Sequence, residues 1–465
     1  MEKEFFSLLW DREEYYEEWV QSKDDRDREY IIDLNLEYLY EEVRRIGGFG
    51  DHYDFRDVFL YSCRESSTVE YRHKIIDRIY RDPRLYDTAV RTVSCVSDTQ
   101  KRLAQVCGIR DELKKKIFFL QVLYEFFVRL GEIYLSLREQ LASSAEIYFR
   151  IAKMAEDIAG QEGEEKRKRL YQYLSMLDGI TPERIVLNKD GNQTCRSAVV
   201  WQEEEGAGYT DRLKAAASFF LGDYDYSIRV YQDMDITCFD KKIQEYLCRR
   251  QPNFVQDTER LYRDCKDFDF WPFIKAANEL VFYLSAVRFR KRYEQEGFVF
   301  TMPKCLDGAQ TRVAGAYDMV LGVNLFREGG GRQAVPNDFC FDPKGRFFIL
   351  TGANQGGKTT FIRSVGLVQH LAQVGLFVPA REAVLGMVKN IHTHFSRADE
   401  EGALAGRFEQ ELKRMRKLLG SLEEGDMVLL NESFTSTRRL GAVALLRWLL
   451  SEFDRRLCVG GLVTH

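Results

Sequence analysis

The sequence predicts a multidomain protein in which an all-α region of long helices precedes an α/β domain. No proline occurs between Arg84 and Thr181, and apolar residues recur in that stretch at the spacings of three and four typical of helices. Beyond Gly297, glycines and short apolar runs typical of buried strands become frequent. At roughly 150 residues per domain, the 465 residues correspond to about three domains.

The helical part consists of two stretches separated by an insert. The first stretch carries an apolar stripe that runs from Ile117 to Leu137. The second resumes after Ile236 and closes with a stripe from Phe273 to Val287, where Pro272 suits the start of a helix. Between them, residues 177–208 are rich in turn formers. We therefore expect long helices with a small insert.

The composition excludes several protein classes. With 45% hydrophobic and 30% charged residues the chain is too apolar to be disordered, and eight prolines exclude a collagen-like or proline-rich chain. No stretch approaches the roughly 20 apolar residues that cross a bilayer, and the charged start Met1–Phe5 does not suit a signal peptide. A net charge of −5 argues against a uniformly basic coat for nucleic acid, although it leaves room for a local basic channel.

Cysteine and histidine usage predicts a cytoplasmic protein without a metal cluster. The ten cysteines are scattered, and no C-x-x-C pattern occurs. His392 and His394 form an H-x-H pair, which lacks a third ligand. We expect buried reduced thiols and surface imidazoles.

A phosphate-binding loop follows the predicted buried strand Arg346–Leu350. Residues Gly352–Thr359 match G-x-x-x-x-G-K-T, and helical spacing follows over Phe361–Val374. Glycines let the backbone wrap around phosphate, the lysine reaches the β- and γ-phosphates, and the Thr359 hydroxyl ligates Mg²⁺. The predicted ATP-binding residues are Gly352, Ala353, Asn354, Gln355, Gly356, Gly357, Lys358, Thr359, Thr360 and His465.

A second strand supplies the other half of the predicted site. Met427–Leu430 is an apolar run that ends in Asn431 and Glu432, about 70 residues after the loop. Many P-loop ATPases place an acidic residue near Mg²⁺ at such a strand end and a following glutamate that activates water. We assign Glu432 as the catalytic base beside Lys358, and Asn431 with Thr359 as Mg²⁺ ligands. An amide holds the metal less strongly than a carboxylate.

A third apolar strand is expected at Leu457–Val463, followed by Thr464 and His465. A histidine at that strand end could sense the γ-phosphate, or it could be the last residue of a fragment. Because such a strand needs neighbours in a sheet, we expect the chain to be truncated at its C-terminus.

Residues 335–465 resemble the ATPase domain of the MutS family of DNA mismatch-repair proteins. The loop is close to the family's T-G-P-N-M-G-G-K-S-T. Further likenesses lie at Val378-Pro379-Ala380, Phe395-Ser396-Arg397, Asp399-Glu400, Gly406-Arg407-Phe408, Glu411-Leu412, Thr435-Ser436-Thr437 and Val463-Thr464-His465. The resemblance implies ATP and Mg²⁺ as cofactors, DNA as a partner, an adenine pocket near Val335–Phe341, and a homodimer with composite ATPase sites.

The resemblance also implies a type and a residue range for each domain. It implies a helical core domain over residues 1–100 and long lever helices over 101–298, with a small clamp-like insert near 177–208. Residues 299–465 then form an incomplete α/β P-loop NTPase domain of the ABC type, MutS-like.

Departures from the family pattern argue against mismatch recognition and against fast ATP hydrolysis. Mismatch-recognising members carry an N-terminal domain with a Phe-x-Glu wedge, whereas the helical pattern here starts within the first dozen residues. The only Phe-x-Glu is Phe326-Arg327-Glu328, beside the ATPase segment. Asn431 replaces an aspartate, the loop after Glu432 is two residues shorter, and Gly406-Arg407 lacks the following Ser-Thr. Slow hydrolysis is therefore expected.

Two functions remain open at this point. The leading hypothesis is a MutS-like ATPase that acts on DNA structure, such as junctions or recombination intermediates, with ATP-driven dimer closure that moves the lever helices. The alternative is a nucleotide-binding dimerisation scaffold with little or no ATPase activity. The third possibility, a structural-maintenance type of ATPase, is disfavoured because the ATPase segment is undivided. The candidate DNA-phosphate contacts, which are equally typical of solvated helix faces, are Arg288–Arg292, Lys166–Arg169 and Lys413-Arg414.

Overall fold

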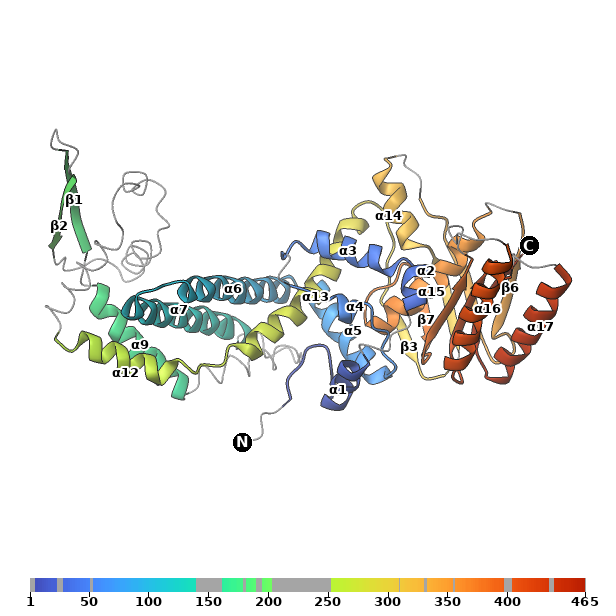
Figure 1. The fold of residues 1–465 in the computed structure, drawn as a ribbon, viewed down its shortest axis with the longest axis horizontal. Coiled ribbons are helices and arrows are strands. Elements are labelled where there is room, and N and C mark those ends of the chain that lie inside the picture. Colours follow the sequence, from blue (N-terminus) through green and yellow to red (C-terminus); the bar gives the residue numbers. More distant parts are fainter. Residues whose placement is uncertain are drawn as a thin grey trace. The chain divides into compact units, whose positions relative to one another are not determined.

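The computed structural model forms two compact units (Figure 1). One unit comprises residues 1–93 and 274–465, and the other comprises residues 94–273. The residues described are 5–22, 28–50, 53–138, 161–178, 181–189, 195–202, 252–308, 310–329, 333–353, 356–396, 404–434 and 439–464.

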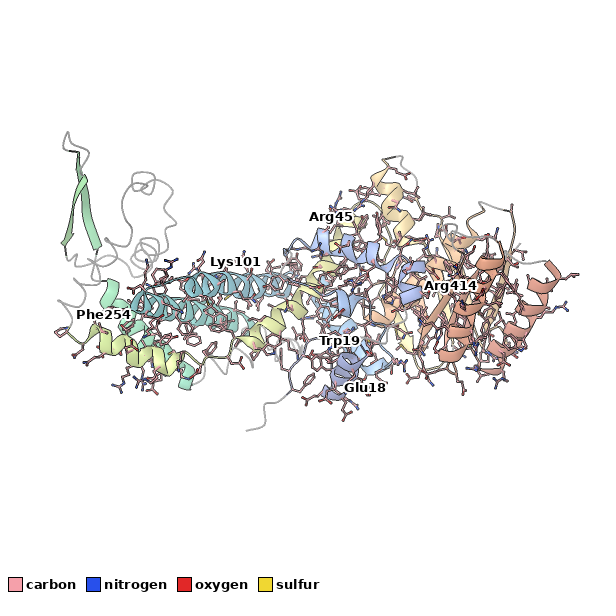
Figure 2. All side chains as sticks on the ribbon, in the orientation of Figure 1. Glu18, Trp19, Arg45, Lys101, Phe254 and Arg414 are labelled. Carbon is pink, nitrogen blue, oxygen red and sulfur yellow. The ribbon has the colours of Figure 1, made fainter. Side chains whose placement is uncertain are left out.

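The second unit is mostly helical. Its helices are the end of α6 (Pro83–Cys107), α7 (Glu112–Arg138), α9 (Gln161–Asp178) and α12 (Phe254–Cys265). The predicted apolar stripe of α7 is buried from Ile117 to Ile133, and α7 packs on α12. Phe254, labelled in Figure 2, stacks on Tyr173 of α9 with ring centroids 6.0 Å apart. Within the predicted insert, strands β1 (Thr181–Lys189) and β2 (Cys195–Gln202) pair in antiparallel fashion.

The helices of the first unit surround buried polar groups. These helices are α1 (Glu13–Gln21), α2 (Arg28–Asp33), α3 (Leu36–Gly47), α4 (Arg56–Phe59), α5 (Ser66–Arg81), the start of α6, α13 (Trp271–Glu294) and α14 (Met319–Arg327). On α13, the Glu279 carboxylate accepts hydrogen bonds from the Ser7 hydroxyl and the Leu8 N–H. On α5, the buried Arg72 guanidinium donates to the carbonyls of Leu9 and Val374. Both contacts anchor the N-terminal segment, because buried charges need such partners.

Two four-stranded sheets complete the first unit. A mixed sheet has the order β3-β7-β4-β5, from β3 (Lys304–Leu306), β7 (Glu382–Gly386), β4 (Thr311–Ala316) and β5 (Asn337–Phe341). An all-parallel sheet has the order β6-β10-β9-β8, from β6 (Phe347–Thr351), β10 (Val459–Thr464), β9 (Met427–Asn431) and β8 (Ile391–Phe395).

Helices cover both faces of the parallel sheet (Figure 1). Val428 and Leu430 of β9 pack with α16 (Leu404–Ser421) and α17 (Arg439–Arg455) in one apolar core. Leu429 points to the opposite face, where α15 (Lys358–Val374) brings Gly366 so close that a Cβ there would lie 2.8 Å from the Leu429 side chain. All five residues of β9 are buried, as a parallel strand between two helical layers should be.

Two expectations about the strands are wrong. The first predicted strand is not buried, because β6 lies at one end of the sheet order and the exposed fraction of Ile349 is 56%. The last predicted strand has a neighbouring strand on each side, because β10 lies between β9 and β6 and pairs with both. It begins at Val459 rather than Leu457, which has a left-handed φ of 54°.

Among the helices that the structure describes, none is long and apolar enough to cross a membrane.

Candidate nucleotide-binding site

The four parallel strands end at one edge of their sheet. Thr351 pairs with Thr464, while Asn431 pairs with Val463 and with Phe395, so the carboxyl ends of β6, β10, β9 and β8 lie together. Open parallel sheets bind ligands at this edge. The Gly-rich loop after β6 leads from this edge into α15.

The loop presents the start of α15 to open space. Gly357 is the N-cap of α15, with φ of 80°, and no side chain caps the helix there. The first N–H groups of a helix have no partner within the helix, so its N-terminus favours an anion. A Cβ built on Gly352 or Gly357 would meet nothing within 4 Å. The backbone of the loop is therefore accessible to a ligand.

Lys358 lies folded over the loop. It is the first residue of α15, and its ammonium donates hydrogen bonds to the carbonyl oxygens of Gly352 and Ala353, both at 2.9 Å. Carbonyl oxygens are neutral acceptors, so a phosphate brought to the same place would be the stronger partner for this cation.

The Thr359 side chain meets the end of β9. Its hydroxyl donates a hydrogen bond to the Asn431 side-chain oxygen at 3.2 Å, across 72 positions of sequence. Hydroxyl and amide oxygens belong to the ligand class that Mg²⁺ takes, together with water and phosphate oxygens. The donor chemistry of this pair fits Mg²⁺, although neither group carries the negative charge of a carboxylate.

Further contacts fix α15 and β8 against neighbouring helices. Arg363 of α15 forms an ion pair with the buried Asp318 at 3.2 Å and donates to the Asp33 carbonyl. The Asp33 carboxylate accepts the N–H of Phe395 at the end of β8. On α16, Arg414 (labelled in Figure 2) donates to the Phe395 carbonyl at 3.2 Å. The carboxyl edge is thus braced on both sides.

The predicted site residues fall into three groups. Lys358, Thr359 and Asn431 contact the loop or one another, as described above, and Glu432 directly follows Asn431 and is half-buried. Gly352, Ala353, Gly356 and Gly357 are exposed along the loop, and Thr360 is half-buried in the first turn of α15. Asn354, Gln355 and His465 lie outside the described residues.

The expectation of surface imidazoles is wrong for the H-x-H pair. His392 and His394 alternate along β8 and are both almost fully buried. His392 lies 2.9 Å from the buried Asp426 carboxylate, and His394 contacts Ser433. Within the described ranges no group of three or more His, Cys, Asp or Glu residues is placed to hold a metal. The seven cysteines whose side chains the structure describes are free; five are buried, while Cys107 and Cys340 are exposed.

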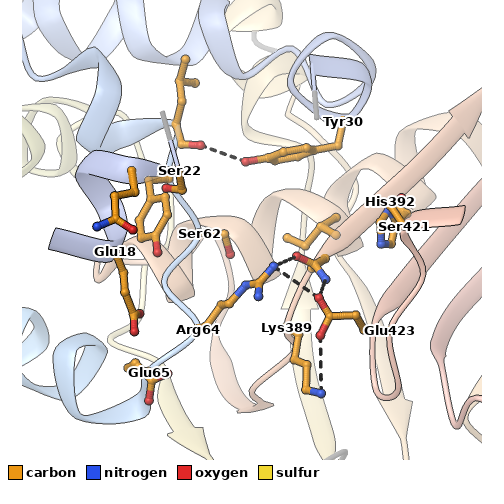
Figure 3. A pocket seen from close by; sticks show the side chains of 15 residues that line it. Glu18, Ser22, Tyr30, Ser62, Arg64, Glu65, Lys389, His392, Ser421 and Glu423 are labelled. Atoms are coloured by element: carbon orange, nitrogen blue, oxygen red, sulfur yellow. Dashed lines mark hydrogen bonds and ion pairs between the residues drawn. The ribbon is translucent and has the colours of Figure 1, made fainter. Parts of the chain in front are cut away.

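A polar cleft of about 790 Å³ lies at the other end of the strands (Figure 3). It borders Ile391 and His392, where β8 begins, and so does not belong to the carboxyl edge. Its two cations, Arg64 and Lys389, both lie 3.6 Å from the Glu423 carboxylate. The cleft's cations are therefore already paired within the protein.

The candidate DNA contacts are engaged within the chain. On α13, Arg290 forms an ion pair with Glu294 and lies over the rings of Tyr80 and Phe377. Arg292 pairs with Glu296. In the other two runs, Arg169 pairs with Glu165, Lys413 with Glu409 and Arg414 with Glu29. These contacts favour the interpretation as ordinary helix faces.

Comparison with known proteins identifies the segment around the loop. Residues 348–453 match the family model described as MutS domain V. This segment of the chain is therefore similar to the MutS family.

Curated relatives are similar to this chain over different lengths. The DNA mismatch repair protein MutS of Thermotoga petrophila is 34% identical over 167 residues, which are 32% of this chain and 21% of that protein. The DNA mismatch repair protein MutS of Chlorobium chlorochromatii is 21% identical over 411 residues, which are 84% of this chain and 46% of that protein. The chain therefore spans less than half the length of these relatives.

Sequence reasoning missed what surrounds the predicted residues. The brace of Arg363 on Asp318, and the contact of His394 with Ser433, join residues far apart in the chain. No local pattern marks either pair. The one usable signal was the position of Ser433 directly after the predicted base.

Proposed function

We propose that this chain binds ATP and Mg²⁺ between the loop Gly352–Thr359 and the end of β9, and hydrolyses the nucleotide as a P-loop ATPase. The observation that carries the proposal is the hydrogen bond between Thr359 and Asn431, beside a lysine folded over its own glycine-rich loop. A loop, a cation and two oxygen ligands then lie at the edge where parallel sheets bind nucleotides.

Each residue has a distinct role in this proposal. Lys358 exchanges the carbonyls of Gly352 and Ala353 for phosphate oxygens, and the N–H groups at the start of α15 bind the same phosphates. Thr359 and Asn431 hold Mg²⁺, which when bound neutralises charge on the phosphates. Glu432 accepts a proton from the attacking water.

Nucleotide affinity of the full chain tests the site. Lys358→Ala should weaken the binding of a fluorescent ATP analogue by at least about tenfold, because one strong charge-assisted contact is lost. Lys389→Ala is the matched control, since Lys389 lies beside the cleft at the opposite end of the strands. If both variants bind as tightly as the wild type, the site is not the one proposed.

The wider function proposed is that of a MutS-like ATPase acting on DNA. In this proposal two chains form a homodimer with composite ATPase sites, and ATP stabilises the closed dimer, which moves lever helices within residues 101–298. The relatives are DNA mismatch repair proteins by name, which supports DNA as the partner.

Binding to branched and to linear duplex DNA across a salt series tests this part. We expect affinity to fall as salt rises, because phosphate contacts release counterions. We also expect the branched duplex to bind more tightly, since structure rather than mismatch reading is proposed. Absence of salt-dependent binding to either duplex contradicts the DNA proposal.

A nucleotide-binding scaffold is the second candidate. Asn431 favours it, because an amide brings no negative charge to the metal site. Turnover separates the two candidates. If the wild type and Glu432→Ala bind ATP and hydrolyse it equally poorly, the scaffold is correct and the enzyme is not.

A further inference from the structure

The turn after β9 has an unusual backbone. Glu432 and Phe434 have φ of 52° and 63°, in the left-handed region that residues other than glycine rarely adopt. Two such residues on either side of Ser433 need outside contacts to persist, and strain of this kind concentrates at functional sites.

Three contacts hold this turn. The N–H of Glu432 donates to the Val463 carbonyl of β10 at 2.9 Å. The Phe434 ring is buried in the core shared with α16 and α17, and stacks on the His394 ring at 5.9 Å. Between them, the Ser433 hydroxyl lies 2.8 Å from Nδ1 of His394.

The pair of Ser433 and His394 is fully inside the protein. Both side chains are at most 5% exposed, so their hydrogen bond is shielded from water. The Nε2 atom of His394 lies 3.4 Å from the Glu411 carbonyl of α16. The Ser433 hydroxyl also donates to the His394 carbonyl oxygen at 3.3 Å, and a proton on Nδ1 of His394 can then be donated to the Ser433 oxygen. With the proton on Nε2 instead, Nε2 donates to the Glu411 carbonyl and the Ser433 hydroxyl donates to Nδ1, so the bond between Ser433 and His394 forms in either tautomer.

We infer that His394 and Ser433 are positioning residues for Glu432. Their bond fixes the middle of the turn, so Glu432 stays in its left-handed conformation directly beyond the Asn431 that contacts Thr359. His394 sits on a different strand, β8, and ties the turn to that strand. The inference rests on the proposed role of Glu432 as the base, and it gives the buried histidine a function other than metal binding.

Hydrolysis and binding, measured separately on the full chain, test the inference. Ser433→Ala and His394→Phe should lower kcat for ATP by roughly 10- to 100-fold, because small misplacements of a catalytic group have effects of that size. The Kd for ATP should change by less than about twofold, since nucleotide contacts lie on the loop and not on this turn. Thr393→Val is the matched control. Its buried hydroxyl on the same strand has no hydrogen-bond partner within the described structure, so kcat should stay at the wild-type value.

A double variant separates positioning from mere structural support. In the Glu432→Gln background, Ser433→Ala should bring no further loss of the residual rate, because the group being positioned is already gone. A further loss of tenfold, or an unchanged kcat in Ser433→Ala alone, overturns the inference. If instead Glu432→Gln hydrolyses ATP at the wild-type rate, it is the proposed function of Glu432 that fails.

Discussion

Thr359 and Asn431 are joined by a hydrogen bond of 3.2 Å that connects the first turn of α15 to the end of β9. Thr359 directly follows Lys358, and Asn431 directly precedes the proposed base Glu432. The contact therefore connects the phosphate-binding loop to the proposed base. An asparagine at this position is neutral, so the pair offers oxygen ligands without the charge that most strongly attracts a divalent cation.

Replacing Asn431 by aspartate should strengthen the metal site. Asn431→Asp keeps the shape of the side chain and adds one negative charge next to the Thr359 hydroxyl. We expect the Mg²⁺ concentration for half-maximal ATP hydrolysis to fall by about tenfold, or about 1.4 kcal/mol. Asn324→Asp on α14 makes the same change at an exposed position and should have no effect. An unchanged Mg²⁺ requirement in Asn431→Asp speaks against residue 431 as a ligand.

Gly460 should be irreplaceable in β10. A Cβ at this position would lie 1.9 Å from the Val428 carbonyl oxygen of β9, and backbone cannot yield as a flexible side chain can. Gly460→Ala should therefore destabilise the fold by about 3 kcal/mol or more, seen as a lower melting temperature. Gly420→Ala in α16 is the control, because a Cβ there meets nothing within 4 Å. It should stabilise by up to about 1 kcal/mol. Equal melting temperatures for the two variants would refute the packing of β10 on β9.

Two buried histidines should make the fold sensitive to mild acid. Burial lowers the pKa of His73 and of His370 from 6.5 to about 4. The unfolded chain therefore binds these protons more readily than the folded chain does. The stability they contribute is complete above pH 6.5 and is lost as the pH falls toward 4, by about 1.4 kcal/mol per pKa unit for each histidine.

Unfolding by urea at several pH values between 7.5 and 4.5 measures this effect. His370→Gln retains a side-chain donor for the Phe59 carbonyl but removes one titrating group. The variant should show a shallower decline of stability between pH 6.5 and 4.5. A decline as steep as that of the wild type would contradict the assignment of His370 as a buried neutral group.

The position of β6 at the sheet edge predicts unequal costs of truncation. Leu429→Ala in the central β9 removes a fully buried side chain and should destabilise by about 2–5 kcal/mol. Ile349→Ala in β6 should cost less than about 1 kcal/mol, because more than half of that side chain is exposed. Comparable losses of stability from the two changes would mean that β6 is covered in solution.

Local patterns predicted β6, β9, β10, the loop and α15, because each depends on neighbouring residues. Local patterns could not predict the order of the strands in the sheet. Nothing near Val459 indicates that β10 lies between β9 and β6, since its pairing partners are 32 positions away in β9 and 113 positions away in β6. The burial of His394 was missed for a related reason: alternation along a strand does not reveal that helices cover both faces of the sheet.

The candidate site shows the same division. The sequence motif predicted that Lys358, Thr359 and Asn431 belong to one site, because its spacing is typical of a known arrangement of strand, loop and helix. It could not predict that Arg363 pairs with Asp318, or that Arg290 lies over Tyr80 and Phe377. Such contacts join distant segments and follow no repeating pattern.

The response of ATP affinity to Mg²⁺ is the sharpest test of the proposed nucleotide site. ATP would be titrated into the full chain with and without Mg²⁺, for the wild type and for Thr359→Val, which keeps the volume of the side chain and removes its hydroxyl. We expect Mg²⁺ to tighten ATP binding to the wild type by at least about tenfold and to leave the ATP affinity of Thr359→Val nearly unaffected. An equal response in both proteins, or no ATP binding by the wild type, would contradict the proposed site.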